Sequence, residues 1–355
     1  MKNRRLFCYN TPMERKEKLA ALAAPLLAWY DKNRRDLPWR ENTDPYRVWV
    51  SEIMLQQTRV EAGKDHYIRF LRELPTVSAL AACPEDKLLK LWEGLGYYSR
   101  AKNMQKAARG IAARGGFPDT AEELEKLPGV GKYTAGAIAS ISFGKPSPAV
   151  DGNVVRVLSR ILGDAEPQDV LRGRYFAELS PAYPKERRGD FTQSLMELGA
   201  LLCLPASPKC LLCPVCGICE TKGDALPLKK EKPARKETDM TVFIFKNEGG
   251  LWLKKRESGV LSGLTEFYNT EEKLSAAQAE TFLCAAGLQN VSLKRAGTHK
   301  HVFTHLIWHM TAYIAETGEN IAALPAFSAL RFYTKEETEK SVSLPSAFRW
   351  CLKFI

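Results

Sequence analysis

The sequence predicts a multidomain protein in which an all-α body is joined by a linker to a smaller α+β domain. Three observations support this organisation. Apolar residues recur at helical spacing as far as Leu202, a run rich in Lys, Pro and Glu follows a cysteine cluster, and β-branched and aromatic residues alternate after Met240. The 355 residues are enough for two separate cores. We therefore expect a tail at 1–12, a helical body at 13–220, a linker at 221–240 and a second domain at 241–355.

The helical body is predicted from windows in which apolar residues recur every three or four positions, with Pro and Gly between the windows. These windows are 17–30, 45–57, 98–113, 131–143 and 188–202. The linker has a composition that cannot bury a core. In the second domain we expect one helix at Glu272–Gly287 and strands at Thr241–Phe245, Leu251–Lys255, His301–Ala315 and Leu330–Tyr333.

The chain is basic, with a formal net charge of +11. Such an excess suits a polyanionic partner, because Lys and Arg at phosphates release counterions. A generic basic protein is the alternative. No stretch has the roughly 20 consecutive apolar residues of a membrane span, and residues 1–12 carry no secretory signal. The sequence therefore predicts a cytoplasmic protein that does not bind membranes.

Five of the nine cysteines fall within the loop Cys203–Cys219. A disulfide scaffold would spread its cysteines through a short secreted chain, so a metal site is the better interpretation. The spacing places four thiolates in one short loop, which suits either zinc or an iron–sulfur cluster. The fifth residue, Cys216, offers further pairs with Cys213 and with Cys219.

The segment Leu127–Ala135 contains Gly129 and Gly131 directly before a predicted helix. Glycines let the backbone turn tightly, and the N–H groups at the start of the helix form an anion site. This is the form of a helix-hairpin-helix, which holds a DNA phosphate without reading sequence. An ordinary turn between two helices is the alternative.

Glu52 and Asp151 are the candidate carboxyl groups. On a helix, Glu52 shares a face with Val48, Trp49 and Leu55, and desolvation there would raise its pKa and suit a general acid. A glutamate at the rim of the helix, facing water, is the alternative. Asp151 precedes an apolar run and is expected to cap its helix. That position would also keep the carboxylate ionised, which suits an electrostatic stabiliser.

Together these segments resemble the endonuclease III superfamily of base-excision enzymes, and within it the MutY adenine glycosylase family. The cysteine spacing matches the [4Fe–4S] loop of the superfamily, which implies the ligands Cys203, Cys210, Cys213 and Cys219. The resemblance to MutY lies in Leu37–Arg40, Ser51–Thr58 and Gly94–Arg100. Bifunctional members carry a Schiff-base lysine where this chain has Tyr133, and Lys132 is expected to point elsewhere. The resemblance therefore implies a monofunctional enzyme without strong lyase activity.

The resemblance implies an enzyme of base excision repair that flips adenine, mispaired with 8-oxoguanine or guanine, out of double-stranded DNA. Glu52 would protonate adenine N7, and Asp151 would stabilise the sugar cation before water completes hydrolysis. The implied catalytic and pocket residues are Glu52, Asp151, Tyr133, Asn153, Arg40, Leu55 and Glu197. The implied DNA contacts in the body are Gln57, Thr58, Leu95, Tyr97, Gly129 and Gly131. Gln57 and Tyr97 would wedge into the duplex. We expect a monomer at the nucleoid.

The second domain resembles the Nudix-like domain of MutY, which checks for 8-oxoguanine opposite adenine. Phe303, Thr304 and His305 stand where the family usually has Phe-Ser-His, and Thr keeps the hydroxyl. The segment Gly263–Tyr268 lacks the usual Trp and Pro, and the Glu-rich box of Nudix hydrolases is missing. On one strand, His299, His301, His305 and His309 would point to one side, and we favour DNA contact or packing over a metal site for them.

Two other functions compete with this interpretation. A glycosylase/lyase for oxidised pyrimidines is disfavoured by Tyr133 and by the extra domain. A DNA-binding protein without catalysis, carrying a zinc loop, would lack both base release and the absorbance of an iron–sulfur cluster at about 400 nm.

Overall fold

The computed structural model describes residues 13–228, 234–247 and 249–354, so the expected tail at 1–12 lies outside the described residues. They form two compact units. One unit comprises the described residues of 1–81 and 103–231, and the other those of 82–102 and 232–355. The sequence places residues 82–102 in the helical body, whereas in the structure they belong to the unit that holds the sheet. There Lys90 Nζ donates to the carbonyl oxygen of Val342 at 2.9 Å, and Glu93 pairs with Arg349 at 2.9 Å.

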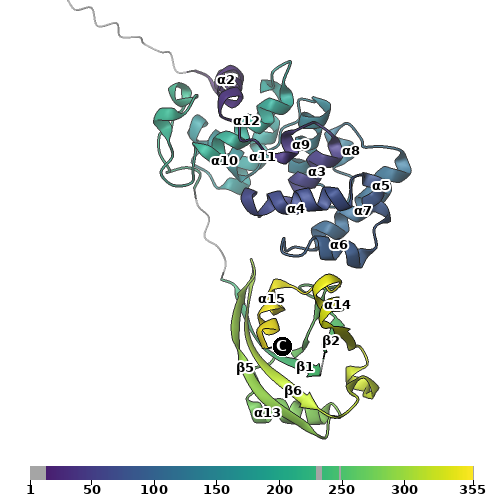
Figure 1. Cartoon of the computed structure of the whole chain (residues 1–355). Coiled ribbons are helices and arrows are strands. Elements are labelled where there is room, and N and C mark those ends of the chain that lie inside the picture. The colour runs from purple at the N-terminus through teal and green to yellow at the C-terminus, as the bar shows by residue number, and fades with distance from the viewer. Residues whose placement is uncertain (1–12, 229–233, 248, 355) are drawn as a thin grey trace, which may run out of the picture. The chain divides into compact units, whose positions relative to one another are not determined.

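The first unit is helical (Figure 1). Its helices are α1 (Arg15–Ala20), α2 (Ala23–Asn33), α3 (Pro45–Met54), α4 (Val60–Glu73), α5 (Val77–Ala82), α7 (Ser99–Arg114), α8 (Ala121–Leu124), α9 (Lys132–Phe143), α10 (Gly152–Leu162), α11 (Gln168–Leu179) and α12 (Arg188–Leu201). Short 3₁₀ turns are η1 (Pro38–Arg40), η2 (Ser180–Ala182), η3 (Cys210–Leu212) and η4 (Cys216–Ile218). Helices α5 and α7 run across the boundary with residues 82–102. Helix α9 packs against α3 and α12, and α12 also packs against α2 and α10. None of the described helices is long and apolar enough to cross a membrane.

Two predicted helices differ from the observed ones. The window 17–30 forms two helices, α1 and α2, because Pro25 has no N–H to donate to the carbonyl of Ala21. The window 45–57 is helical only as far as Met54, and Gln57 has a left-handed φ of 60°. The other three windows match α7, α9 and α12 within one residue at each end.

The second unit contains a mixed sheet. Its elements are α6 (Glu85–Leu91), β1 (Lys236–Asn247), β2 (Gly250–Lys255), β3 (Thr265–Glu266), β4 (Tyr268–Thr270), α13 (Ala276–Ala285), β5 (Val291–Val302), β6 (Leu306–Thr317), η5 (Ile321–Ala323), η6 (Pro325–Phe327), β7 (Arg331–Thr334), α14 (Lys335–Lys340), α15 (Ser346–Arg349) and η7 (Trp350–Phe354). The strand order is β3-β2-β1-β6-β5, with β4 paired to β1 and β7 to β2. Strands β1 and β6 run parallel, and the other pairs are antiparallel.

Strand β1 is buried on both faces of the sheet. Met240, Val242 and Ile244 pack into a core that includes Phe348 of α15. Phe243 and Phe245 pack into a second core, which includes residues of α13. Helices α13 and α15 therefore cover opposite faces, as Figure 1 shows. Burial on both faces explains the uninterrupted apolar run in this strand.

Two further expectations are corrected in this region. The segment His301–Ala315, expected to be one strand, contains the end of β5, a hairpin turn and most of β6. The turn is closed by the Phe303 N–H on the Leu306 carbonyl oxygen at 2.8 Å. The expected linker at 221–240 is partly structured. Leu226 is buried and its carbonyl accepts from Arg160 Nε at 2.8 Å, while β1 already begins at Lys236.

Candidate active site

Glu52 lies on the buried side of α3. Asp44 caps this helix by accepting the N–H groups of Tyr46 and Arg47, and Pro45 fits the first helical turn. The Glu52 side chain is buried, and burial raises its pKa to about 7, with Asp151 adding to the rise. This confirms that Glu52 is desolvated and excludes a position on the rim that faces water.

Tyr133 donates a hydrogen bond from its Oη to Glu52 Oε2 at 2.5 Å. This bond lowers the pKa of Glu52, against the larger effect of burial. Burial also raises the pKa of Tyr133 well above its ordinary value, so the phenol stays protonated and acts as the donor. Tyr133 is therefore bonded directly to the candidate acid.

The turn before α9 positions Tyr133. Gly129 has a φ of 77°, and a Cβ there would lie 2.7 Å from Asn103 Cβ, so both backbone and space require glycine. Gly131 caps α9 with an extended backbone, and a Cβ there would meet nothing within 4 Å. The fold itself does not require glycine at this second position.

Asp151 caps α10, as its place in the sequence predicts. Its carboxylate accepts the Val154 N–H at 2.7 Å and the Asn153 amide at 2.8 Å. Burial raises the pKa of Asp151, and these two hydrogen bonds lower it. The hydrogen bonds of the cap lower the pKa of Asp151, as expected, but burial raises it by more. The pKa of Asp151 therefore lies above its ordinary value.

Asn153 is in turn held by Arg156, which donates to its Oδ1 at 2.9 Å. Arg156 also donates to the carbonyl oxygen of Cys203 at 2.8 Å. Gly199 lets α12 approach closely, because a Cβ there would lie 2.6 Å from Asn153 Cβ. The amide that holds Asp151 is thereby fixed against both α12 and the start of the cysteine loop.

Glu197 is buried on α12 and paired with two arginines. Arg35 Nη2 lies 2.7 Å and Arg40 Nη2 lies 2.9 Å from Glu197 Oε2. Burial alone would raise the pKa of Glu197, but the hydrogen bonds from Arg35 and Arg40 outweigh it and hold the pKa at about 2. Sequence reasoning missed Arg35. Arg35 lies two residues before the segment Leu37–Arg40 that resembles MutY, and this proximity could have identified it.

These residues line one cleft of about 910 Å³ within the helical unit. It brings together ten residues that the sequence singles out: Arg40, Glu52, Leu55, Gln57, Thr58, Gly131, Tyr133, Asp151, Asn153 and Glu197. Lys132, the first residue of α9, is exposed at the edge of the same cleft. Arg172, Gln193 and Met196 line the cleft as well and were not predicted.

Leu95, Tyr97 and Gly129 do not line this cleft. Leu95 is buried, whereas Tyr97 is 45% exposed and has a φ of 46°. Gln57, at the cleft, is also exposed and has a φ of 60°. Left-handed backbone is costly for residues other than glycine and is often kept at functional sites. The two residues expected to wedge into DNA share this unusual backbone.

Phe303, Thr304 and His305 form the turn between β5 and β6. Phe303 packs edge-on against Trp308, with ring centroids 4.8 Å apart. Thr304 contacts Tyr97, with their hydroxyl oxygens in hydrogen-bond contact, and its carbonyl oxygen accepts from Arg235 Nε at 3.2 Å. Phe303 therefore anchors the turn while Thr304 and His305 are exposed.

The four histidines of this region do not share one side. His299 stacks on Trp350 with centroids 5.3 Å apart, and His301 neighbours it on β5. His309 pairs across the hairpin with Lys300, on the other face, and contacts Glu237 at 2.8 Å. The expectation of a single histidine face fails because the segment is a hairpin, in which strand pairing sets the faces.

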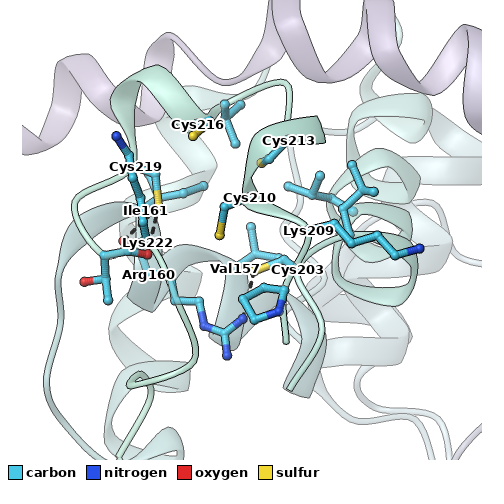
Figure 2. Close-up of a pocket in the computed structure, with 15 residues that line it drawn as sticks. Val157, Arg160, Ile161, Cys203, Lys209, Cys210, Cys213, Cys216, Cys219 and Lys222 are labelled. Atoms are coloured by element: carbon cyan, nitrogen blue, oxygen red, sulfur yellow. Dashed lines mark hydrogen bonds between the residues drawn. The ribbon is translucent and has the colours of Figure 1, made fainter. Parts of the chain in front are cut away.

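The five cysteines of the loop Cys203–Cys219 line one cavity (Figure 2). Among the residues that the structure describes, no three His, Cys, Asp or Glu side chains converge as they would on a single metal ion. The thiols surround the cavity, and cysteine thiolates are ligands both of zinc and of iron–sulfur clusters. Burial raises the pKa of the Cys213 and Cys219 thiols to about 11.

Two protein-family models match this chain, one in its helical part and one in its sheet-containing part. Residues 50–180 match the model of the HhH-GPD superfamily base excision DNA repair protein, and residues 240–354 match that of a NUDIX domain. The adenine DNA glycosylase of Rattus norvegicus is 33% identical, over 93% of this chain and 78% of the relative. The chain belongs to the adenine DNA glycosylase family.

Other similarities fit membership of this family. The adenine DNA glycosylase of Arabidopsis thaliana is 37% identical over 79% of this chain, which spans 55% of that relative's length. The solved structure of a thermostable thymine-DNA glycosylase is 29% identical, covers 57% of this chain and 95% of its own, and has a TM-score of 0.53. The matches confirm the predicted helix-hairpin-helix body and the Nudix-like second domain.

Proposed function

We propose that this protein is a monofunctional DNA glycosylase that removes adenine mispaired with 8-oxoguanine or guanine. The observation that carries the proposal is a pair of carboxyl groups in one cleft, the buried Glu52 and the half-buried Asp151, with Tyr133 bonded to Glu52. Family membership supplies the substrate class, and the cleft supplies the chemistry. The protein would act as a monomer at the nucleoid, with one chain bound at each mispair.

Glu52 is the general acid. With a pKa of about 7 it is protonated in about half of the molecules near neutral pH, and it gives its proton to N7 of the flipped adenine. The protonated base is a better leaving group, so the bond to the sugar breaks as an oxocarbenium-like ion forms.

Asp151 stabilises that cation. It is held in place by the Val154 N–H and by Asn153, so it needs no reorganisation when positive charge develops nearby. Water then completes hydrolysis. Because Tyr133 occupies the place of the Schiff-base lysine, we expect no efficient cleavage of the DNA strand.

The walls of the pocket and the DNA contacts are assigned on the same basis. Arg40, Leu55, Tyr133, Asn153 and Glu197 would surround the adenine. Gln57 and Tyr97 would fill the space that the base leaves. Thr58 and Leu95 are also proposed DNA contacts, and Gly129 and Gly131 would admit a DNA phosphate. Phe303, Thr304 and His305 would meet 8-oxoguanine, with the Thr304 hydroxyl making the contact that distinguishes it from guanine.

The cysteine loop would hold a [4Fe–4S] cluster through Cys203, Cys210, Cys213 and Cys219. When bound, the cluster supplies four iron–thiolate bonds that hold the loop closed. Arg160 holds the start of this loop, because its Nη1 donates to Cys203 Sγ at 3.3 Å and to the Leu204 carbonyl oxygen at 2.7 Å. The test is absorbance at about 400 nm and iron content of the purified protein.

The decisive test of activity is release of adenine from duplexes that carry adenine opposite 8-oxoguanine, guanine or cytosine, followed by alkali to cleave abasic sites. We expect release from the first two duplexes and strand breaks only after alkali. Glu52→Gln should abolish release and leave DNA binding nearly intact, because the amide has no proton of suitable acidity to give. Glu336→Gln, in exposed α14, is the matched control. Full activity of Glu52→Gln would overturn the assignment of the acid.

A further inference from the structure

The cysteine loop contains the same backbone turn twice. Cys210 and Cys216 each begin a three-residue 3₁₀ turn. Each turn is closed by an N–H of the next cysteine in the loop, with Cys213 donating to Cys210 at 3.1 Å and Cys219 donating to Cys216 at 3.4 Å. Cys213 and Cys219 also share nearly the same backbone, with φ and ψ of −77° and 125° and of −81° and 125°.

Cys216 therefore holds in the second turn the place that Cys210 holds in the first. Three of these four cysteines, namely Cys210, Cys213 and Cys219, are proposed cluster ligands, and Cys216 is the one left over. Its side chain lines the same cavity as theirs, and Figure 2 shows the Cys216 thiol in the part of the loop that also carries Cys213 and Cys219.

A third turn fixes the distance between the two repeats. The Cys216 N–H donates to the Cys213 carbonyl oxygen at 3.1 Å, and a turn closed in this way brings the two Cα atoms within about 7 Å. The same limit applies between Cys216 and Cys219. Val215, just before Cys216, is buried in the core of the helical unit, so the second turn is anchored. Cys216 thus stands within one turn of two proposed ligands.

We propose that Cys216 is a reserve ligand of the cluster, able to take the place of Cys213 or Cys219. This inference rests on the [4Fe–4S] cluster proposed above. In the exchange, one iron–thiolate bond breaks, the Cys216 thiol passes its proton to the departing thiolate, and an iron–Cys216 bond forms. The iron oxidation states do not change, so the exchange needs no oxidant or reductant.

The test is the cluster content of full-length variants purified without oxygen, measured by iron analysis and visible absorbance. We expect about four irons per chain in the wild type and in Cys216→Ser, because Cys216 is not a ligand at rest. Cys219→Ala and Cys213→Ala should each keep about half or more of the wild-type iron. The double variants that add Cys216→Ser should lose nearly all of it. Cys203→Ala, which removes a ligand from outside the repeated turns, should lose its iron although Cys216 is present.

The outcomes separate the two proposals. A wild-type protein without iron would overturn the cluster itself. A wild-type protein with iron, but with both single variants as empty as their double variants, would overturn the reserve ligand alone. So would single variants that keep their iron equally well without Cys216, or loss of the cluster in Cys216→Ser. Far-ultraviolet circular dichroism shows that an empty variant is folded, so loss of iron is not mistaken for unfolding.

Discussion

Replacing Tyr133 by Phe tests the proposed acid without removing it. The Tyr133 hydroxyl donates to Glu52 Oε2 at 2.5 Å and lowers the pKa of that carboxyl by favouring its charged form. Catalysis requires the protonated form, so activity is lost as the pH rises through the pKa of Glu52. Without the hydroxyl this pKa rises further, and Tyr133→Phe should keep its activity to a higher pH than the wild type.

The size of the effect follows from the hydrogen bond. At its ordinary pKa of 4.5, a glutamate would be protonated in about 0.3% of molecules at pH 7, whereas a pKa of about 7 gives about half. A hydrogen bond to a charged group contributes about 1.5–3 kcal/mol, and about 1.4 kcal/mol corresponds to one pH unit. We therefore expect the alkaline midpoint of the rate to move upward by about one to two pH units in Tyr133→Phe.

The assay is single-turnover release of adenine opposite 8-oxoguanine, followed between about pH 5 and pH 10, a range that contains the alkaline limb of the rate. The plateau rate of Tyr133→Phe can be lower than that of the wild type, because a weaker acid gives its proton less readily. The prediction is therefore judged by the alkaline midpoint alone. Tyr183→Phe is the matched control: this tyrosine bonds to Thr192 at 2.8 Å, away from the cleft, and its loss should leave the midpoint unchanged. An unchanged or lowered midpoint in Tyr133→Phe would refute the reasoning.

Three further predictions test other parts of the structure. The pKa of Glu197 is held at about 2, so this carboxylate stabilises the fold above the unfolded pKa of about 4.3 and loses that effect as pH falls toward 2. Between pH 6 and pH 3 the urea midpoint should therefore fall less in Glu197→Gln than in the wild type. An equal fall in both proteins would argue against this stabilisation. In Gly136→Ala the new Cβ would lie 1.9 Å from the Pro148 carbonyl oxygen, so we expect a clear loss of thermal stability, whereas Gly110→Ala, with nothing within 4 Å, should be neutral or mildly stabilising; equal melting temperatures would contradict this. Thr304→Ala should weaken the preference for 8-oxoguanine over guanine opposite adenine while Thr304→Ser keeps it, and an unchanged ratio of rates would remove Thr304 from recognition.

The sequence predicted the parts of the site that depend on local patterns. The cap at Asp151 follows from an acidic residue before an apolar helical run, and burial of Glu52 follows from its apolar neighbours at helical spacing. The turn at Gly129 follows from glycines before a helix. Each of these features is decided by residues within about one helical turn, so periodicity and capping rules reach them.

Features that depend on residues far apart in the chain were out of reach. The contact of Arg35 with Glu197 joins residues 162 positions apart. The hairpin at Phe303–His305 was hidden because apolar alternation continues on both sides of the turn, and a period of two cannot show where one strand ends. The grouping of residues 82–102 with the sheet likewise rests on contacts such as that of Lys90 with Val342.

Burial raises the pKa of both carboxyl groups of the cleft, but the two groups differ in their hydrogen-bond donors. Asp151 accepts a backbone N–H and an amide, both fixed by α10, so part of the cost of its charge is met before any substrate binds. Glu52 accepts only from Tyr133 among the bonds found for its carboxylate in the described residues, and the nearby Asp151 carboxylate disfavours a second negative charge. The charged form of Glu52 is therefore stabilised by fewer donors than that of Asp151. This difference in donors is what supports the proposal that Glu52 is the acid and that Asp151 stabilises the cation.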